Sequence, residues 1–162
     1  MRTSTPYRQL SAERRVALVT HAISSSREMR ALFIQRLAAL PGGFRAVTLQ
    51  PWPADRLAKE VVRRNAQKPD DERDLLHLLY VELEPAIQTA FVEAAGVKHE
   101  DGRIADDVEA PYADADAVRR AAATVRERFG ADADHYLRTI ARYNPEGWPG
   151  IEELVMELGP AE

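Results

Sequence analysis

The sequence predicts an all-α protein: a bundle of seven to eight short helices, with one small β-hairpin near residues 97–104. Two observations predict this class. Apolar residues recur at spacings of three and four along most of the chain, which is the pattern of one helix face. Serine, aspartate, glycine and proline stand between these stretches, where helices begin and end. With 162 residues, the chain can bury roughly 70% of its unfolded surface.

Two helices are predicted before residue 41. Ser11 caps the first, whose apolar stripe is Ala12, Val16, Val19 and Ile23. Ser26 caps the second, whose stripe is Met29, Phe33, Leu37 and Leu40. Pro41-Gly42-Gly43 ends the second helix.

Two more helices are predicted before residue 85. Residues 44–52 form either an extended segment or a short turn, and Pro53 suits the first turn of the third helix. Pro69-Asp70-Asp71 is interpreted as a turn and cap, so the fourth helix begins near Glu72. Its inward side chains are Leu75, Leu76, Leu79 and Leu83.

Pro85 predicts a break in the helical pattern. Inside a helix it would remove a hydrogen bond and clash with the preceding turn, at a cost of roughly 3 kcal/mol. A fifth helix therefore begins at Pro85 and ends at Gly96. After it, Asp101-Gly102 between short flanks is typical of a β-hairpin turn.

The last part of the chain is predicted to be an acidic loop followed by three helices. The loop has the sequence ADDVEAPYADAD, residues 105–116. Asp114 or Asp116 caps the sixth helix, and Gly130 ends it. The seventh begins at Asp132 and ends at Tyr143-Asn144-Pro145, and a short helix from Ile151 to Leu158 closes the chain.

Charge is divided unequally between the two halves. Residues 1–68 contain 13 Lys/Arg and 4 Asp/Glu, a net charge of +9, whereas residues 69–162 contain 9 Lys/Arg and 22 Asp/Glu, a net charge of −13. We therefore expect a basic four-helix bundle in residues 1–84 and an acidic helical segment in residues 85–162. The two either pack as one domain or stand as two.

Motifs for catalysis and cofactor binding are missing from the sequence. The chain has no cysteine, which excludes disulfides, thiolate metal sites and cysteine nucleophiles. It has no P-loop, G-x-G-x-x-G, H-E-x-x-H or G-x-S-x-G motif. We therefore predict no catalytic residue, metal or cofactor. One alternative stays open: a small metal-dependent enzyme that uses the turn His99-Glu100-Asp101.

Six cations form the candidate binding site. Arg56, Lys59 and Arg63 share one face of the third helix, since their spacings are three and four. Arg64 flanks them, and Arg27 and Arg30 form a shorter pair on the second helix. Such a set can bind phosphates or an acidic protein. Because the sequence places no exposed aromatic residue beside them for base stacking, an acidic protein partner is favoured.

Residues 10–85 resemble the effector-associated domains of bacterial conflict and signalling proteins, which are death-domain-like helical bundles. The resemblance rests on LVTHAISSSREMRALFIQRL (residues 18–37), WPADRLAKEVVRRNAQ (residues 52–67) and DLLHLLYVELEP (residues 74–85). It implies a helical bundle that docks on other proteins and has no catalytic residues.

These observations together predict a non-enzymatic adaptor for protein–protein interaction. Its partner is a protein with an acidic surface or a homotypic helical domain, and nucleic acid binding by the basic helices is the alternative. The chain contains no apolar run of the ~20 residues that a spanning helix needs, and its first residues do not resemble a signal peptide. We therefore expect a cytoplasmic protein that does not bind membranes.

Overall fold

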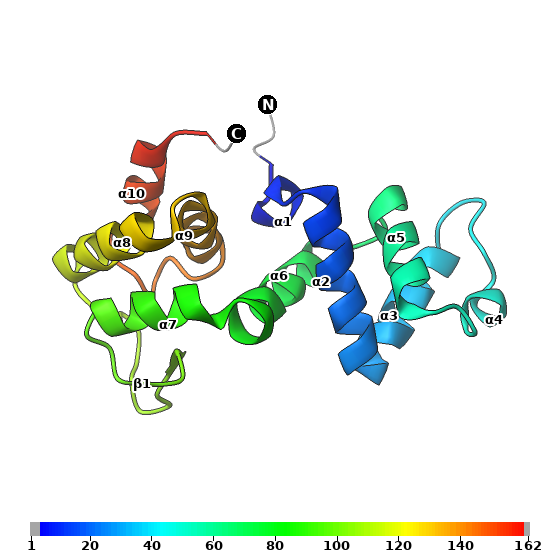
Figure 1. Ribbon diagram of the computed structural model, residues 1–162, viewed down its shortest axis with the longest axis horizontal. Coiled ribbons are helices and arrows are strands. Elements are labelled where there is room, and N and C mark those ends of the chain that lie inside the picture. Colours follow the sequence, from blue (N-terminus) through cyan, green and yellow to red (C-terminus); the bar gives the residue numbers. More distant parts are fainter. Residues whose placement is uncertain (1–3, 161–162) are drawn as a thin grey trace. The chain divides into compact units, whose positions relative to one another are not determined.

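The computed structural model describes residues 4–160, and these residues are mostly helical, as the sequence predicts (Figure 1). They divide into two compact units. One unit is Leu10–Leu78, and the other combines the described residues up to Gln9 with those from Leu79 onward. The division at Leu78 falls inside a helical segment that continues toward Pro85. The segment up to Gln9 belongs to the second unit because His135 Nε2 is hydrogen bonded to the Pro6 carbonyl oxygen at 2.7 Å.

The unit Leu10–Leu78 is built from five helices, α2 to α6. Their bounds are Ala12–Ser25 (α2), Arg27–Ala38 (α3), Ala46–Leu49 (α4), Ala54–Arg64 (α5) and Pro69–Leu78 (α6). α2 packs on α3, α5 and α6, and α5 also packs on α3. The core of this unit contains Leu18, Val19, Phe33, Leu37, Leu49, Leu57, Val61 and Leu75, each at most 1% exposed.

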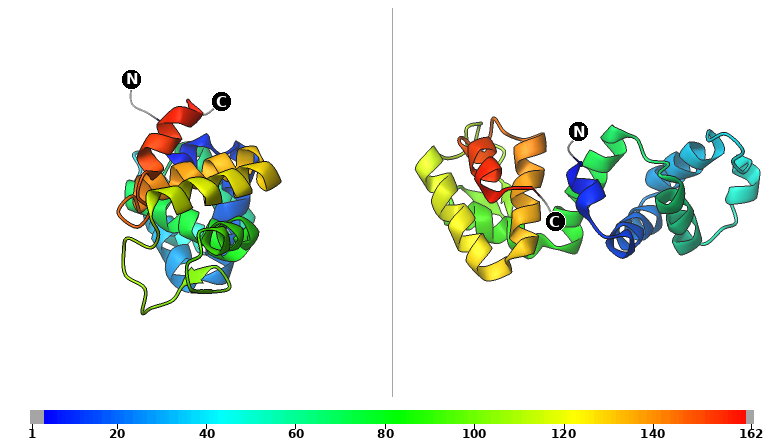
Figure 2. Two further views of the ribbon diagram at one scale, coloured as in Figure 1. Left: turned by 90° about the vertical axis from the view of Figure 1, so that its left-hand side faces the viewer. Right: turned by 90° about the horizontal axis from the view of Figure 1, so that it is seen from above.

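The other unit contains the remaining elements. They are α1 (Pro6–Gln9), the π-helix η1 (Leu79–Leu83), α7 (Pro85–Ala94), β1 (His99–Glu100), β2 (Arg103–Ile104), α8 (Ala115–Phe129), α9 (Ala131–Tyr143) and α10 (Ile151–Leu158). α7 packs on α8, and α10 lies against α8 and α9 (Figure 2). Aromatic rings fill its centre: the Phe91 ring lies 4.8 Å from that of Trp148 and 5.5 Å from that of Tyr136.

The caps predicted at Ser11 and Ser26 are confirmed, and so is one of the two considered for α8. The hydroxyl oxygens of Ser11 and Ser26 accept hydrogen bonds from the backbone N–H groups of Arg14 and Met29. Of the two aspartates considered for α8, it is Asp114 whose carboxylate accepts from the Ala117 N–H at 2.8 Å. A side-chain oxygen at this position satisfies an N–H group that the helix itself cannot bond.

The predicted β-hairpin is also confirmed. β1 and β2 are antiparallel, and His99 pairs with Ile104 while Glu100 pairs with Arg103. The turn residues Asp101 and Gly102 have φ values of 51° and 83°. A type I′ turn requires positive φ at both central positions, which is why Asp-Gly favours it.

Four details of the prediction were wrong or incomplete. α6 begins at Pro69 instead of near Glu72, because the Asp71 carboxylate accepts the Lys68 N–H at 2.8 Å and so holds the first turn. The single-turn helices α1 and α4 were not predicted. Leu83, expected to point inward, is 40% exposed.

The exposure of Leu83 has a local cause. The segment that reaches Pro85 does not stop at α6 but widens into the π-helix η1, where the Glu84 N–H donates to the Leu79 carbonyl at 2.7 Å. A π-turn contains more residues per turn than an α-turn. Leu83 therefore no longer lies on the face that Leu75, Leu76 and Leu79 bury, and it is exposed. Pro85 then begins α7, as predicted.

Candidate interaction surface

α5 separates an apolar face from a basic one. Leu57, Ala58 and Val61 are fully buried, and α5 packs through this face on α2 and α3. Arg56, Lys59 and Arg63 lie on the exposed side. The sequence therefore identified correctly which α5 side chains face solvent, because burial of the apolar stripe leaves the cations no other place.

Two of these cations have acidic neighbours on their own helix. Lys59 Nζ lies 3.8 Å from the Asp55 carboxylate, and Arg63 pairs with Glu60. The hydrogen bond from Arg63, outweighing burial, lowers the pKa of Glu60, and the same contact raises the pKa of Arg63. Both cationic side chains are 69% exposed. The Asp55 side chain is 60% exposed and that of Glu60 is 16% exposed. A pair exposed on both sides, such as Lys59–Asp55, contributes little to stability, so a partner's carboxylates can compete for Lys59, and the exposed guanidinium of Arg63 can contact a partner as well.

Arg56 belongs to an aromatic cluster. Its guanidinium carbon lies 3.7 Å from the centre of the Trp52 ring, and the Phe44 ring meets Trp52 edge-on at 4.9 Å. Trp52 is 9% exposed, whereas Phe44 is 40% exposed. The expectation that no exposed aromatic residue lies beside the cations was wrong, because the fold brings residue 44 back to the start of α5.

Arg30 and Arg64 differ from the other cations, since both bind backbone carbonyls. Arg30 Nη2 donates to the carbonyls of Gln50 and Trp52, each at 2.7 Å. Arg64 Nη2 donates to the Pro41 carbonyl at 3.0 Å. These two arginines hold both ends of the segment between α3 and α5, which contains α4.

We define the α4–α5 surface as Phe44, Arg45, Val47, Arg56, Lys59 and Arg63. All six side chains are exposed, and α4 lies at an edge of its unit (Figure 1). Arg45 and Val47 were not singled out from the sequence, since residues 44–52 showed no clear pattern. Arg27, at the start of α3, is exposed as well.

The turn His99-Glu100-Asp101 is shaped by the hairpin. His99 Nδ1 accepts a hydrogen bond from the Gly102 N–H at 3.0 Å, and Glu100 is an exposed strand residue. Among residues 4–160, no group of three or more histidine, aspartate or glutamate side chains is arranged to hold a metal ion.

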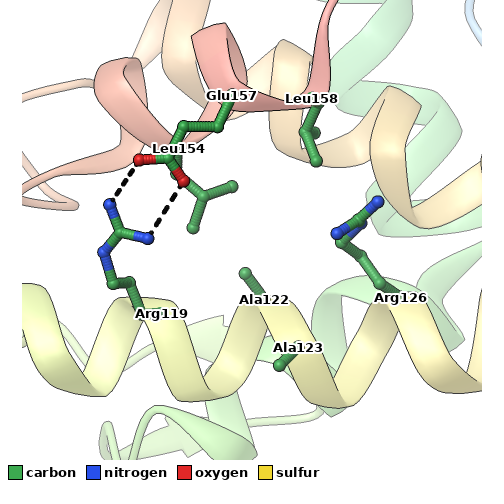
Figure 3. Close-up of a pocket in the computed structure, with 7 residues that line it drawn as sticks. All are labelled: Arg119, Ala122, Ala123, Arg126, Leu154, Glu157 and Leu158. Atoms are coloured by element: carbon green, nitrogen blue, oxygen red, sulfur yellow. Dashed lines mark hydrogen bonds and ion pairs between the residues drawn. The ribbon is translucent and has the colours of Figure 1, made fainter.

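An open groove of about 370 Å³ lies between α8 and α10 (Figure 3). Ala122, Ala123 and Leu154 contribute apolar surface to it. Arg119 and Glu157 join across one end, through hydrogen bonds of 3.1 and 2.9 Å. The hydrogen bond from Arg119 lowers the pKa of Glu157, so both groups stay charged and satisfy each other.

A buried polar cluster was missed by sequence reasoning. His135 is 7% exposed, and its Nδ1 is hydrogen bonded to the Tyr80 hydroxyl while its Nε2 contacts the Pro6 carbonyl oxygen. Since a carbonyl only accepts, Nε2 donates to Pro6, and in a neutral imidazole this leaves Nδ1 as the acceptor for the Tyr80 hydroxyl. The cluster holds α1, η1 and α9 together. Nothing in the local sequence indicated it, because its members are 55 and 129 residues apart.

Comparison with known proteins returned no match, whether to protein-family models, to curated proteins or to solved structures. No helix among the described residues is both long enough and apolar enough to cross a membrane.

Proposed function

We propose that this protein is a non-enzymatic interaction module that binds an acidic surface of a partner protein through the α4–α5 surface. One observation carries the proposal. The contacts of Arg30, Arg56, Lys59, Arg63 and Arg64 are all made with residues between Pro41 and Glu60. Arg56, Lys59 and Arg63 therefore make their contacts locally and stay exposed, where they can meet carboxylates of a partner.

The resemblance to effector-associated domains supports the same proposal. It covers residues 10–85, a range close to the compact unit Leu10–Leu78, and proteins of that class act by docking. A place in a bacterial conflict or signalling system, in the cytoplasm, belongs to this proposal. Charge on such a surface sets orientation and association rate more than affinity.

The test is a triple charge reversal, Arg56→Glu, Lys59→Glu and Arg63→Glu. We expect the variant to lose at least tenfold in binding to partners that wild type captures from the native cell, measured by affinity purification and mass spectrometry. Loss of each ion contact costs about 1 kcal/mol or less, and the reversal adds repulsion. The variant should keep its thermal unfolding midpoint within a few degrees, because all three side chains are exposed.

A matched control is Arg103→Glu, Arg120→Glu and Arg142→Glu, which makes the same change in net charge on exposed positions of the other unit. Retention of every partner by the α5 variant, or equal loss in the control, would contradict the proposal.

Nucleic acid binding remains the second candidate, and exposed Phe44 favours it. An aromatic ring beside arginine can stack with a base of a single strand. A labelled single-stranded DNA or RNA that binds wild type at about 50 mM salt, and not the α5 variant, would support this alternative, since phosphate contacts are strongest at low salt.

A further inference from the structure

The α4–α5 surface carries apolar side chains that charge alone does not explain. Val47 is 74% exposed and Phe44 is 40% exposed, and they are two of the four large hydrophobic residues exposed in the described part of the chain. Arg45 stands between them in sequence. An exposed apolar pair flanked by cations is suited to a segment that offers an apolar side chain between carboxylates.

This surface is held in place. Leu49, the last residue of α4, is fully buried, and Arg30 binds the carbonyls of Gln50 and Trp52 just after it. Trp52 contacts both Phe44 and Arg56. These contacts already order the backbone and the rings of the α4–α5 surface. Binding of a ligand therefore costs little conformational entropy on the side of the protein.

The chain itself contains a segment of the complementary chemistry. Residues 105–114, between β2 and α8, form neither helix nor strand. Asp106, Asp107 and Glu109 are exposed, and Val108, between Asp107 and Glu109, is half-buried and so still presents part of its side chain to solvent. Lys98 pairs with Asp107 at 3.0 Å, and Asp114 at the end of the segment caps α8. Asp106 and Glu109 are the two further carboxylates of this segment. Residues 115 and 116 of the predicted loop belong to α8, so from here on the acidic loop means residues 105–114.

We propose that the α4–α5 surface of one copy binds the acidic loop of a second copy, with Val108 against Phe44 and Val47 and the loop carboxylates against Arg45 and Arg56. The inference rests on the proposed function, since it uses the same surface. The unit Leu10–Leu78 has 12 Lys/Arg and 8 Asp/Glu, a net charge of +4, whereas the rest of the chain has a net charge of −8. Every copy thus carries both a basic surface and an acidic loop that can bind each other's counterpart on another copy.

The geometry of such a contact has two consequences. Two different surfaces meet, so the interface is heterologous, and each copy keeps one surface and one loop free to bind further copies. One short loop on a small apolar pair also buries far less than the ~1,600 Å² of a standard interface. The association is therefore weak, and it weakens further as salt screens the charges.

The test is sedimentation velocity of the full chain over a range of protein concentrations. At about 20 mM salt the weight-average sedimentation coefficient should rise with concentration, and at about 500 mM salt it should stay at the monomer value, because the Debye length shortens several-fold. A monomer under both conditions overturns the inference.

Two variants separate the surface from the loop. Phe44→Ser with Val47→Ser removes the apolar part of the surface, and Asp106→Asn with Glu109→Gln removes the loop charges. Each variant alone should remain monomeric at low salt. An equimolar mixture should form a dimer and nothing larger, because the first variant supplies an intact loop and the second an intact surface.

Met156→Ser, at an apolar position of the other unit that is 80% exposed, is the control and should associate like wild type. Association that persists in either double variant alone, as a symmetric dimer would show, overturns the inference. So does a mixture that stays monomeric while both variants keep the wild-type far-ultraviolet circular dichroism spectrum. Capture of a foreign acidic protein by a chain that never self-associates would refute this inference and leave the proposed function standing.

Discussion

Arginine side chains of the same formal charge have three different roles in Leu10–Leu78. Arg30 and Arg64 bind backbone carbonyls and so fix a loop. Arg56 lies over an indole ring, a contact worth about 0.5–1 kcal/mol at an exposed site. Arg36 pairs with a buried carboxylate. The sequence alone does not separate these roles. The groups that each arginine contacts in the fold determine which arginines are available to a partner.

The Arg36–Asp71 pair joins α3 to α6 through two hydrogen bonds to a buried carboxylate. Arg36 Nε and Nη2 reach the two Asp71 oxygens at 2.8 and 3.1 Å, and the Asp71 side chain is 4% exposed. Burial raises the pKa of Asp71, but the hydrogen bonds from Arg36 and from the Lys68 N–H outweigh it, so that pKa lies below its usual value.

We predict that Asp71→Asn lowers the free energy of unfolding by about 3 kcal/mol at neutral pH, since Arg36, whose side chain is 20% exposed, loses the charged acceptor of two hydrogen bonds. A carboxyl group whose pKa is depressed in the folded state stabilises above its unfolded pKa, and it loses that contribution as pH falls through the folded pKa. The difference from wild type should therefore shrink below about pH 4, as measured by urea unfolding at several pH values.

Asp70→Asn is the control for that prediction, because Asp70 lies in the same first helical turn but is exposed. It should cost less than about 0.5 kcal/mol. Equal losses in the two variants would show that charge near the helix N-terminus, and not the ion pair, explains the effect.

At the scale of single elements, the hairpin turn shows how a short motif becomes fixed by its surroundings. The Asp-Gly pair predicts the turn type, and the structure adds a second constraint at Gly102. A Cβ atom there would lie 2.6 Å from Thr89 Oγ1 and 3.1 Å from the Thr89 backbone nitrogen, on α7. The turn therefore needs glycine both for its positive φ and for the close approach of α7.

We predict that Gly102→Ala lowers the free energy of unfolding by about 3 kcal/mol, since backbone strain at positive φ adds to the collision with Thr89. Gly96→Ala tests strain alone, because Gly96 has a φ of 74° and a Cβ there would meet nothing within 4 Å. It should cost about 1 kcal/mol. Thermal unfolding of both variants checks the difference, and similar losses would show that the contact with Thr89 relaxes freely.

At the scale of the whole molecule, each compact unit contains its own buried residues. Leu10–Leu78 has a core of large apolar side chains and its own ion pair with a buried carboxylate. A domain of roughly 60 residues buries about 60% of its unfolded surface, which is enough for marginal stability. Folding of this unit thus depends on few contacts.

We predict that residues 10–78, expressed alone, give a helical circular dichroism spectrum and a cooperative thermal transition. The same fragment with Phe33→Ala should be largely unfolded, because removing a fully buried phenylalanine costs about 3–5 kcal/mol. A wild-type fragment without a transition would show that the unit needs the rest of the chain to fold.

The sequence alone determined the all-α class, most helix bounds, the caps at Ser11 and Ser26, the hairpin turn and the exposed face of α5. These features depend on residues three or four positions apart, or on φ preferences of single residues, so a local pattern contains the necessary information. The same local patterns failed at Leu83, where a π-turn shifts the register, and at α4, whose short segment has no periodicity.

Only the tertiary structure decided which cations hold a loop and which stay exposed, that Phe44 lies beside Arg56 through Trp52, and that His135 joins Tyr80 and Pro6. It also decided that the described residues up to Gln9 pack with those from Leu79 onward. The physical reason is that these contacts join residues far apart in the chain, and their free energy depends on the burial and distance that the complete fold creates.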